Sequence, residues 1–240
     1  MTDIWSRLLG RRNRARHIEP NLKAFARKVH SQFDEDGIIE KLAACLGIER
    51  GTFFEFGIGP AWNTPPEAGL EGNFVLLREK GWSGVFLDGN EHPPQLGVSR
   101  EFITPLNINH LYAKYHLPDD LDFMSIDIDG QELWVWLALI ARPKVVIVEY
   151  NGSVPADQSV SIPFDVDHVW DGTRYHGASL KALDKVAKAK FYTLVFANGV
   201  NAFFVRDDLV ANKGDFRYDD LYAAYPGHPE DPQNRPWVQI

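Results

Sequence analysis

The chain is poor in sulfur-containing residues: its 240 residues include one cysteine, Cys45, and two methionines. A single cysteine excludes an internal disulfide and a Cys-rich zinc site, and it is typical of a protein from a reducing compartment. No apolar run reaches the ~18 to 20 residues that a membrane span needs, and the N-terminus has no apolar signal-peptide core. These absences predict a cytoplasmic protein without a transmembrane segment.

Positive charge is concentrated at one end of an otherwise acidic chain. Residues 1–30 hold eight Lys or Arg against two acidic residues, whereas the formal net charge of the whole chain is −8. An acidic body argues against a nucleic-acid-binding core, so we expect no DNA partner. The basic segment could instead contact an acidic membrane surface, a partner protein or RNA.

The length favours one large domain with appendages over two full domains, at about 150 residues per domain. Apolar residues make up 45% of the chain and charged residues 24%, values typical of a folded globular protein. We expect a basic helical extension over 1–30, a main domain over 31–210, and a tail over 211–240 that packs on the domain.

Helical and strand patterns alternate along the main domain. Helical periodicity is seen at 31–47, 73–80, 131–141 and 178–190, and the expected strands lie within 52–59, 83–90, 101–108, 122–130 and 144–151. Two further apolar runs in 191–208 are joined by Asn198-Gly199, which is the strongest short signal for a β-hairpin. This alternation predicts a parallel sheet with helices on both faces and a ligand site at the carboxyl ends of the strands.

Several short strings occur in an order that resembles the FkbM-like branch of S-adenosylmethionine (SAM)-dependent methyltransferases. They are SQFDEDGII, FFEFGIG, an Asn-Thr pair, EKGWSGVFLDGN and SIDIDGQE, over roughly residues 31–206. The first loop departs from common versions through Trp62 and a Pro-Pro pair at 65 and 66. The resemblance implies a Rossmann-like class I fold, with a mostly parallel seven-stranded sheet and a C-terminal antiparallel hairpin. It also implies SAM as cofactor and methyl transfer to a hydroxyl, often on a sugar or polyketide.

The expected cofactor site begins at two glycines that follow the first strand, where the main chain can approach a ligand closely. A dinucleotide fingerprint would need a third glycine at position 62, so pyrophosphate binding is disfavoured. An acidic residue at the second strand's end can accept the ribose hydroxyls of a nucleoside. Plain turn chemistry is the alternative at both places. The predicted cofactor-binding residues are Glu55, Gly57, Gly59, Asn63, Thr64, Asp88, Asn90 and Asn107.

Carboxylates also gather after the fourth and fifth strands. Asp127 and Asp129 would share one face of a strand, and Glu149 and Asn151 would end its neighbour. Hard oxygen ligands of this kind suit Mg²⁺ or Ca²⁺, which could lower the pKa of an acceptor hydroxyl. The alternatives are helix capping by Asp129 and solvated strand ends. Without a metal, Asp127 becomes a candidate base or cofactor contact.

Residues 152–177 lack periodicity and form either a lid or a disordered insertion; we expect a mobile flap over the acceptor. His168 and His176 lie in this loop, and either could accept the hydroxyl proton, with aromatic neighbours available to a sugar ring.

The favoured function is that of a SAM-dependent O-methyltransferase acting on a sugar, a related polar metabolite or a glycan. A bound metal ion could assist the reaction. One alternative is a nucleotide-sugar glycosyltransferase that holds a metal through Asp-x-Asp. The other is a non-catalytic Rossmann-like binding domain. The sequence leaves open whether the protein is a homo-oligomer.

Overall fold

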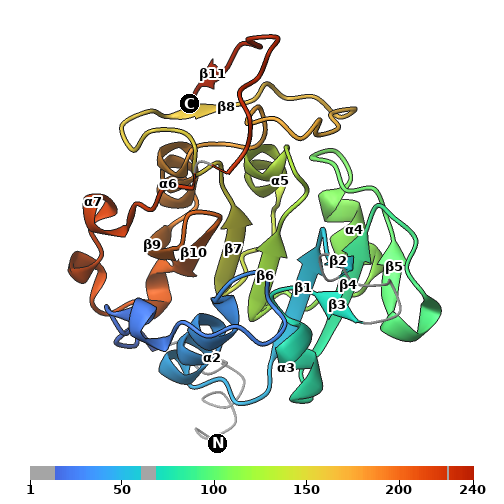
Figure 1. Cartoon of the computed structure of the whole chain (residues 1–240). Coiled ribbons are helices and arrows are strands. Elements are labelled where there is room, and N and C mark those ends of the chain that lie inside the picture. The colour runs from blue at the N-terminus through green and yellow to red at the C-terminus, as the bar shows by residue number, and fades with distance from the viewer. Residues whose placement is uncertain (1–13, 61–68, 226) are drawn as a thin grey trace, which may run out of the picture.

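A seven-stranded sheet forms the centre of the protein (Figure 1). The computed structural model describes residues 14–60, 69–225 and 227–240, and no helix in these ranges is long and apolar enough to cross a membrane. In spatial order the strands are β5 (Val98–Arg100), β4 (Ser83–Asp88), β1 (Thr52–Phe56), β6 (Phe123–Ile126), β7 (Val145–Glu149), β10 (Asn201–Arg206) and β9 (Tyr192–Ala197).

Strand β10 pairs antiparallel with both β7 and β9, while the other adjacent pairs are parallel. Strands β9 and β10 are consecutive in the chain, so they form the hairpin predicted around Asn198-Gly199, where Gly199 has a φ of 103°. The strand order and the reversed β10 confirm the predicted Rossmann-like sheet, which is mostly parallel and seven-stranded with a C-terminal antiparallel hairpin.

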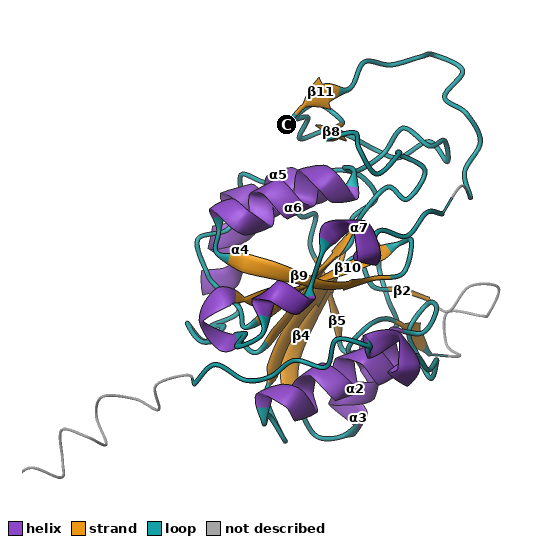
Figure 2. Ribbon diagram, turned by 90° about the vertical axis from the view of Figure 1, so that its left-hand side faces the viewer, coloured by secondary structure: helices purple, strands orange, loops and turns teal. Residues whose placement is uncertain are grey.

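Helices cover both faces of the sheet (Figure 2). One face carries α2 (Glu35–Leu46) and α3 (Val75–Glu79), and the other carries α4 (Ile108–Lys114), α5 (Glu132–Ala138) and α6 (Leu180–Ala189). A short α7 (Tyr218–Leu221) follows the hairpin. Two small antiparallel pairs complete the fold: β2 (Gly59–Pro60) with β3 (Leu70–Glu71), and β8 (Val160–Ser161) with β11 (Val238–Gln239).

The helix boundaries follow from identifiable capping residues. Helix α2 ends at Gly47, which adopts a φ of 70° that other residues rarely adopt. Helix α6 begins after Ser179, whose side-chain oxygen accepts the backbone N–H of Ala182 at 3.1 Å. Both ends lie where the sequence predicts them.

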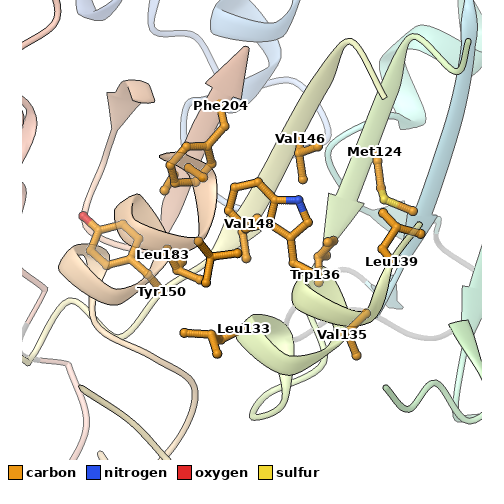
Figure 3. Packing of buried hydrophobic residues seen from close by; sticks show 14 of the residues in the cluster. Met124, Leu133, Val135, Trp136, Leu139, Val146, Val148, Tyr150, Leu183 and Phe204 are labelled. Atoms are coloured by element: carbon orange, nitrogen blue, oxygen red, sulfur yellow. The ribbon is translucent and has the colours of Figure 1, made fainter. Parts of the chain in front are cut away.

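Two hydrophobic layers enclose the sheet, and Trp136 is central to one of them (Figure 3). Its ring lies 4.8 Å from Phe204 on β10 and 5.8 Å from Tyr192 on β9. On the opposite face, Phe53 of β1 packs 4.9 Å from Phe86 of β4. Because both faces are covered, the apolar run of β7 is buried throughout, as expected for a central strand.

The strand predicted over 101–108 is wrong. The pairing strand is the earlier β5, and the chain then turns before α4. Asn107 stabilises this turn, since its side-chain oxygen accepts the N–H of Thr104 at 2.8 Å and its amide donates to the carbonyl of Phe102 at 2.7 Å. Pro105 lacks a backbone donor and cannot extend a ladder.

The described part of the N-terminal extension, residues 14–30, contains a 3-10 turn at Leu22–Phe25, and residues 1–13 of the predicted helical extension lie outside the described residues. The described part is attached to the body. Ile18 and Leu22 are buried against the α2 side of the sheet, and the backbone N–H of Arg16 donates to the carbonyl of Leu209 at 2.7 Å.

Candidate functional site

A cleft of about 450 Å³ opens at the carboxyl ends of β5, β4, β1 and β6. The chain leaves β1 toward β4 and β5 on one side and returns to β6 on the other, so the cleft lies at a topological switch point. Its lining residues come from the loops after these strands and from the long loop: Gly57, Gly59, Asp88, Gly89, Asn90, Phe102, Ile103, Thr104, Pro105, Ile128, Asp129, Gln131, Val166, His168, Val169 and Trp170.

Gly57 is required by the backbone geometry of the first loop. Its φ is 81°, and a Cβ built there would lie 1.4 Å from the carbonyl oxygen of Asp127. The loop after β1 therefore packs backbone to backbone against the loop after β6. At Gly59 a Cβ would meet no atom of the described residues within 4 Å, and Gly59 lines the cleft. The predicted ligands Asn63 and Thr64 lie outside the described residues.

Glu55 points to α3 and is absent from the cleft lining. Its two carboxylate oxygens accept the backbone N–H groups of Asn73 at 2.6 Å and Phe74 at 2.8 Å, at the start of α3. Burial raises its pKa from 4.5 to about 7. The structure thus gives Glu55 a role in attaching α3 to β1, in place of the predicted cofactor contact.

Asp88 ends β4, as the sequence predicts, and it lines the cleft together with Asn90. Its Oδ1 accepts the backbone N–H of Asn90 at 2.6 Å and lies 3.3 Å from Nε2 of His92, whose side chain is buried. Within the described part of the chain, Oδ2 has no hydrogen-bond partner. That oxygen is available to the hydroxyl groups of a ribose.

Asn107, the remaining predicted cofactor residue, is absent from the lining. Both ends of its amide hold the turn before α4, as described above. Its effect on the cleft is indirect, because that turn carries the lining residues 102–105.

Asp127, Asp129 and Glu149 form a carboxylate cluster in which one oxygen of each residue lies within 4.8 Å of the others. The sequence placed both aspartates on a strand, but β6 ends at Ile126 and they belong to the following loop. Asp129 has a φ of 56°, a strained conformation for a residue other than glycine. The loop geometry still brings the two carboxylates together with Glu149 at the end of β7.

Burial and mutual repulsion raise the proton affinity of this cluster. Burial raises the pKa of Asp127 well above its usual value, and the charges of Asp129 and Glu132 raise it further. The pKa of Glu149 is also raised well above its usual value, first by burial and then by the charge of Asp127. Oε2 of Glu149 is buried without a partner among the described residues. Three carboxylates this close together repel one another when they are ionised, and their hard oxygen atoms fit a divalent cation such as Mg²⁺ or Ca²⁺.

Asn151 is not available to this cluster without a rearrangement. Its amide nitrogen donates to the carbonyls of Arg174 at 2.7 Å and His176 at 2.9 Å, and its oxygen accepts from Ser153. The predicted metal ligand therefore anchors the long loop. An amide satisfied at both ends stabilises a loop and makes a poor metal ligand.

Glu132 is a site residue for which no role was predicted, although it is the last residue of the string SIDIDGQE. It is fully buried at the start of α5, and its Oε1 accepts the N–H groups of Ile128 at 3.0 Å and Gly130 at 2.7 Å. Burial raises its pKa to about 7. Glu132 thereby fixes the loop that presents Asp127 and Asp129.

His168 belongs to the long loop, packs against Gly130 in the loop after β6, and lines the cleft. A Cβ added to Gly130 would lie 2.2 Å from its ring, so the absence of a side chain there makes room for the imidazole. Burial lowers the pKa of His168, and a hydrogen bond with the backbone of Asp129 opposes this effect. Its Nε2 is buried without a partner in the described ranges. A neutral imidazole at this place can accept a proton.

His176 is more deeply buried, with 4% of its surface exposed, and burial lowers its pKa to about 4. It is therefore uncharged near neutral pH and a weak base. Its ring lies 5.4 Å from Trp170 and 5.2 Å from His228, which belongs to the C-terminal tail. No local pattern in the sequence points to His228, because only the fold brings the tail to the loop.

No family model and no curated protein matches the chain. Among solved structures, the chain is similar to the MycE methyltransferase from the mycinamycin biosynthetic pathway in complex with Mg, SAH and mycinamycin VI. The identity is 13%, the match covers 86% of this chain and 61% of that chain, and the TM-score is 0.47. A second structure of MycE, with Mg and SAH in crystal form 1, is 14% identical over 82% of this chain and 56% of that chain, with a TM-score of 0.46. This chain thus spans about three fifths of the length of the chains it matches.

Proposed function

We propose that the protein is a SAM-dependent O-methyltransferase of the FkbM-like type, which methylates a hydroxyl of a sugar, a related polar metabolite or a glycan. One observation carries the proposal. The glycine loop after β1, the open carboxylate oxygen of Asp88 after β4, and the carboxylate cluster after β6 and β7 all meet at one edge of the sheet. In this proposal a nucleoside site and a cation site are neighbours.

The chain's own residues suggest a division of labour. Gly57 and Gly59 let the backbone approach the amino-acid end of the cofactor, and Oδ2 of Asp88 would accept its ribose hydroxyls. When bound, SAM supplies an electrophilic methyl group, and a divalent cation would make an acceptor hydroxyl more acidic.

Asp127, Asp129 and Glu149 would hold that cation. His168, which lies against the same loop and is uncharged near neutral pH, would accept the acceptor's proton. Methyl transfer would then depend mainly on positioning and deprotonation.

Calorimetric titration tests the proposal with four probes: SAH, NAD, a UDP-sugar and Mg²⁺. We expect SAH to bind and NAD and the UDP-sugar to give no heat. Binding of the UDP-sugar without SAH would favour the glycosyltransferase alternative, and binding of none of the nucleosides would favour a non-catalytic domain.

The Asp88→Ala variant sharpens this test. The loss of hydrogen bonds to a charged acceptor, worth ~1.5 to 3 kcal/mol, should weaken SAH binding by about tenfold or more. Asp119→Ala is the matched control, because Asp119 is exposed and precedes β6 at the opposite edge of the sheet. Unchanged SAH affinity in Asp88→Ala would remove Asp88 from the cofactor site.

A further inference from the structure

The C-terminal segment 227–240 lies beside the long loop 152–177 and pairs with it where β11 meets β8 (Figures 1 and 2). Strand β11 in this segment is hydrogen-bonded to β8 in the loop. The backbone N–H of Arg174 donates to the carbonyl of Pro229 at 2.9 Å. Loop and tail therefore form one joined layer beside the cleft.

Arg235 fastens this layer at its centre. Its guanidinium lies 2.6 Å from a carboxylate oxygen of Asp171 and 3.1 Å from the hydroxyl of Thr173. It also lies over the ring of Tyr175, 4.2 Å from the ring centre, and that ring in turn packs 5.2 Å from Trp237. Such a set of contacts gives the tail one defined position on the loop.

That position brings His228 into contact with two residues of the loop. Its ring lies 4.8 Å from Trp170 and 5.2 Å from His176, nearly perpendicular to both. Trp170 lines the cleft, and Nδ1 of His176 is buried without a hydrogen-bond partner among the described residues. A buried polar atom without a partner is uncommon in folded proteins, and this nitrogen is free to form a hydrogen bond with a hydroxyl group.

We propose that Trp170 and His176 of the long loop and His228 of the C-terminal segment form an acceptor subsite, which binds a non-ionic ring bearing hydroxyl groups. The inference rests on the proposed methyltransferase function. Imidazole nitrogens exchange hydrogen bonds with hydroxyls, and the indole provides an apolar face for a saturated ring.

The surrounding charges favour an uncharged ring over an anionic one. The nearest cationic side chains of the loop and the tail are already paired: Arg174 lies 2.7 Å from Glu230, and Arg235 lies 2.6 Å from Asp171. An anionic ring would have to compete with these carboxylates and would also face the acidic Asp129 in the cleft.

Saturation-transfer NMR on the SAH-saturated protein tests the subsite, with methyl glucoside, methyl galactoside, methyl mannoside and methyl rhamnoside as probes. At least one glycoside should bind the wild type. His228→Ala should weaken that binding about five- to tenfold, the effect of losing one hydrogen bond. His228→Gln, which keeps a donor and an acceptor, should restore most of it.

Two further variants distinguish the direct contact of His228 with the glycoside from the docking of the tail on the loop. Arg235→Ala removes the contacts of the tail with Asp171, Thr173 and Tyr175 and leaves the three subsite residues unchanged, so it should also weaken glycoside binding. Gln233→Ala is the matched control, because Gln233 is exposed on the same segment. All variants should keep the SAH affinity of the wild type.

The outcomes are distinguishable. Wild-type glycoside affinity in His228→Ala would overturn the role of His228, and a SAH-saturated wild type that binds none of the glycosides would overturn the subsite. Failure to bind SAH would instead refute the proposed function.

Discussion

Glu132 offers a sharp test of the electrostatics of the site. Its carboxyl group is fully buried below the loop of residues 127–130, where Oε1 accepts two backbone N–H groups and Oε2 has no partner within the described ranges. Burial raises its pKa from 4.5 to about 7. The folded protein therefore binds this proton more tightly than the unfolded chain does.

The sign and size of the effect on stability follow from linkage. Between pH 4.5 and about 7 the folded state holds a proton that the unfolded state has lost, so the free energy of unfolding falls as the pH rises through this window. A rise in pKa from 4.5 to about 7 corresponds to about 3 kcal/mol. Glu132→Gln keeps an oxygen that can accept the two N–H groups and has no proton to lose.

Urea unfolding of the wild type and Glu132→Gln at about pH 5, 6, 7 and 8, in the presence of a chelator, measures this effect. Between pH 5 and pH 8 the free energy of unfolding of the variant should rise by up to about 3 kcal/mol relative to that of the wild type. Glu49→Gln is the matched control, since Glu49 is exposed, and it should follow the wild type. Parallel stability curves for the wild type and Glu132→Gln would refute the reasoning.

Four other substitutions and the addition of Mg²⁺ have defined outcomes. Gly57→Ala should lower the free energy of unfolding by about 2 kcal/mol or more, through strain at a positive φ and a clash with the carbonyl of Asp127, whereas Gly59→Ala should have little effect on urea unfolding. Mg²⁺ should raise the melting temperature more at about pH 8 than at about pH 6, because protons compete for Asp127 and Glu149, and Asp127→Asn should abolish this rise. Ser179→Ala should lower the unfolding free energy by about 1 kcal/mol through loss of the N-cap of α6.

Local signals in the sequence account for most of the fold. The apolar run of β7, the glycine that ends α2, the serine cap of α6 and the Asn-Gly hairpin each act over a few residues, so their effects can be predicted without tertiary contacts. The strand predicted over 101–108 fails for a different reason. Its apolar residues, such as Ile103, are buried by packing below a turn, and burial alone does not distinguish a turn from a strand.

The site was predictable only in part, because its side chains are brought together from distant segments. Asp88 and the Asp127–Asp129 pair end or follow strands, which places them at the ligand-binding edge of any parallel sheet. Asn151 also follows a strand, yet the amide is used by a loop whose path the sequence does not reveal. His228 reaches the site through contacts between distant segments, among them the pairing of β11 with β8, in which Val238 lies opposite Ser161, 77 positions earlier in the chain.

The carboxyl groups around the loop after β6 are the strongest sign that this edge of the sheet has a function. Asp127, Glu132 and Glu149 all have raised pKa values, and none of them forms an ion pair with a Lys or Arg in the described ranges. A fold under selection for stability alone would replace such residues, because buried carboxyl groups without cationic partners weaken it near neutral pH. Either protons or a bound cation must offset this repulsion. The pH dependence of the response to Mg²⁺ distinguishes the two, since a cation displaces protons from the same oxygen atoms.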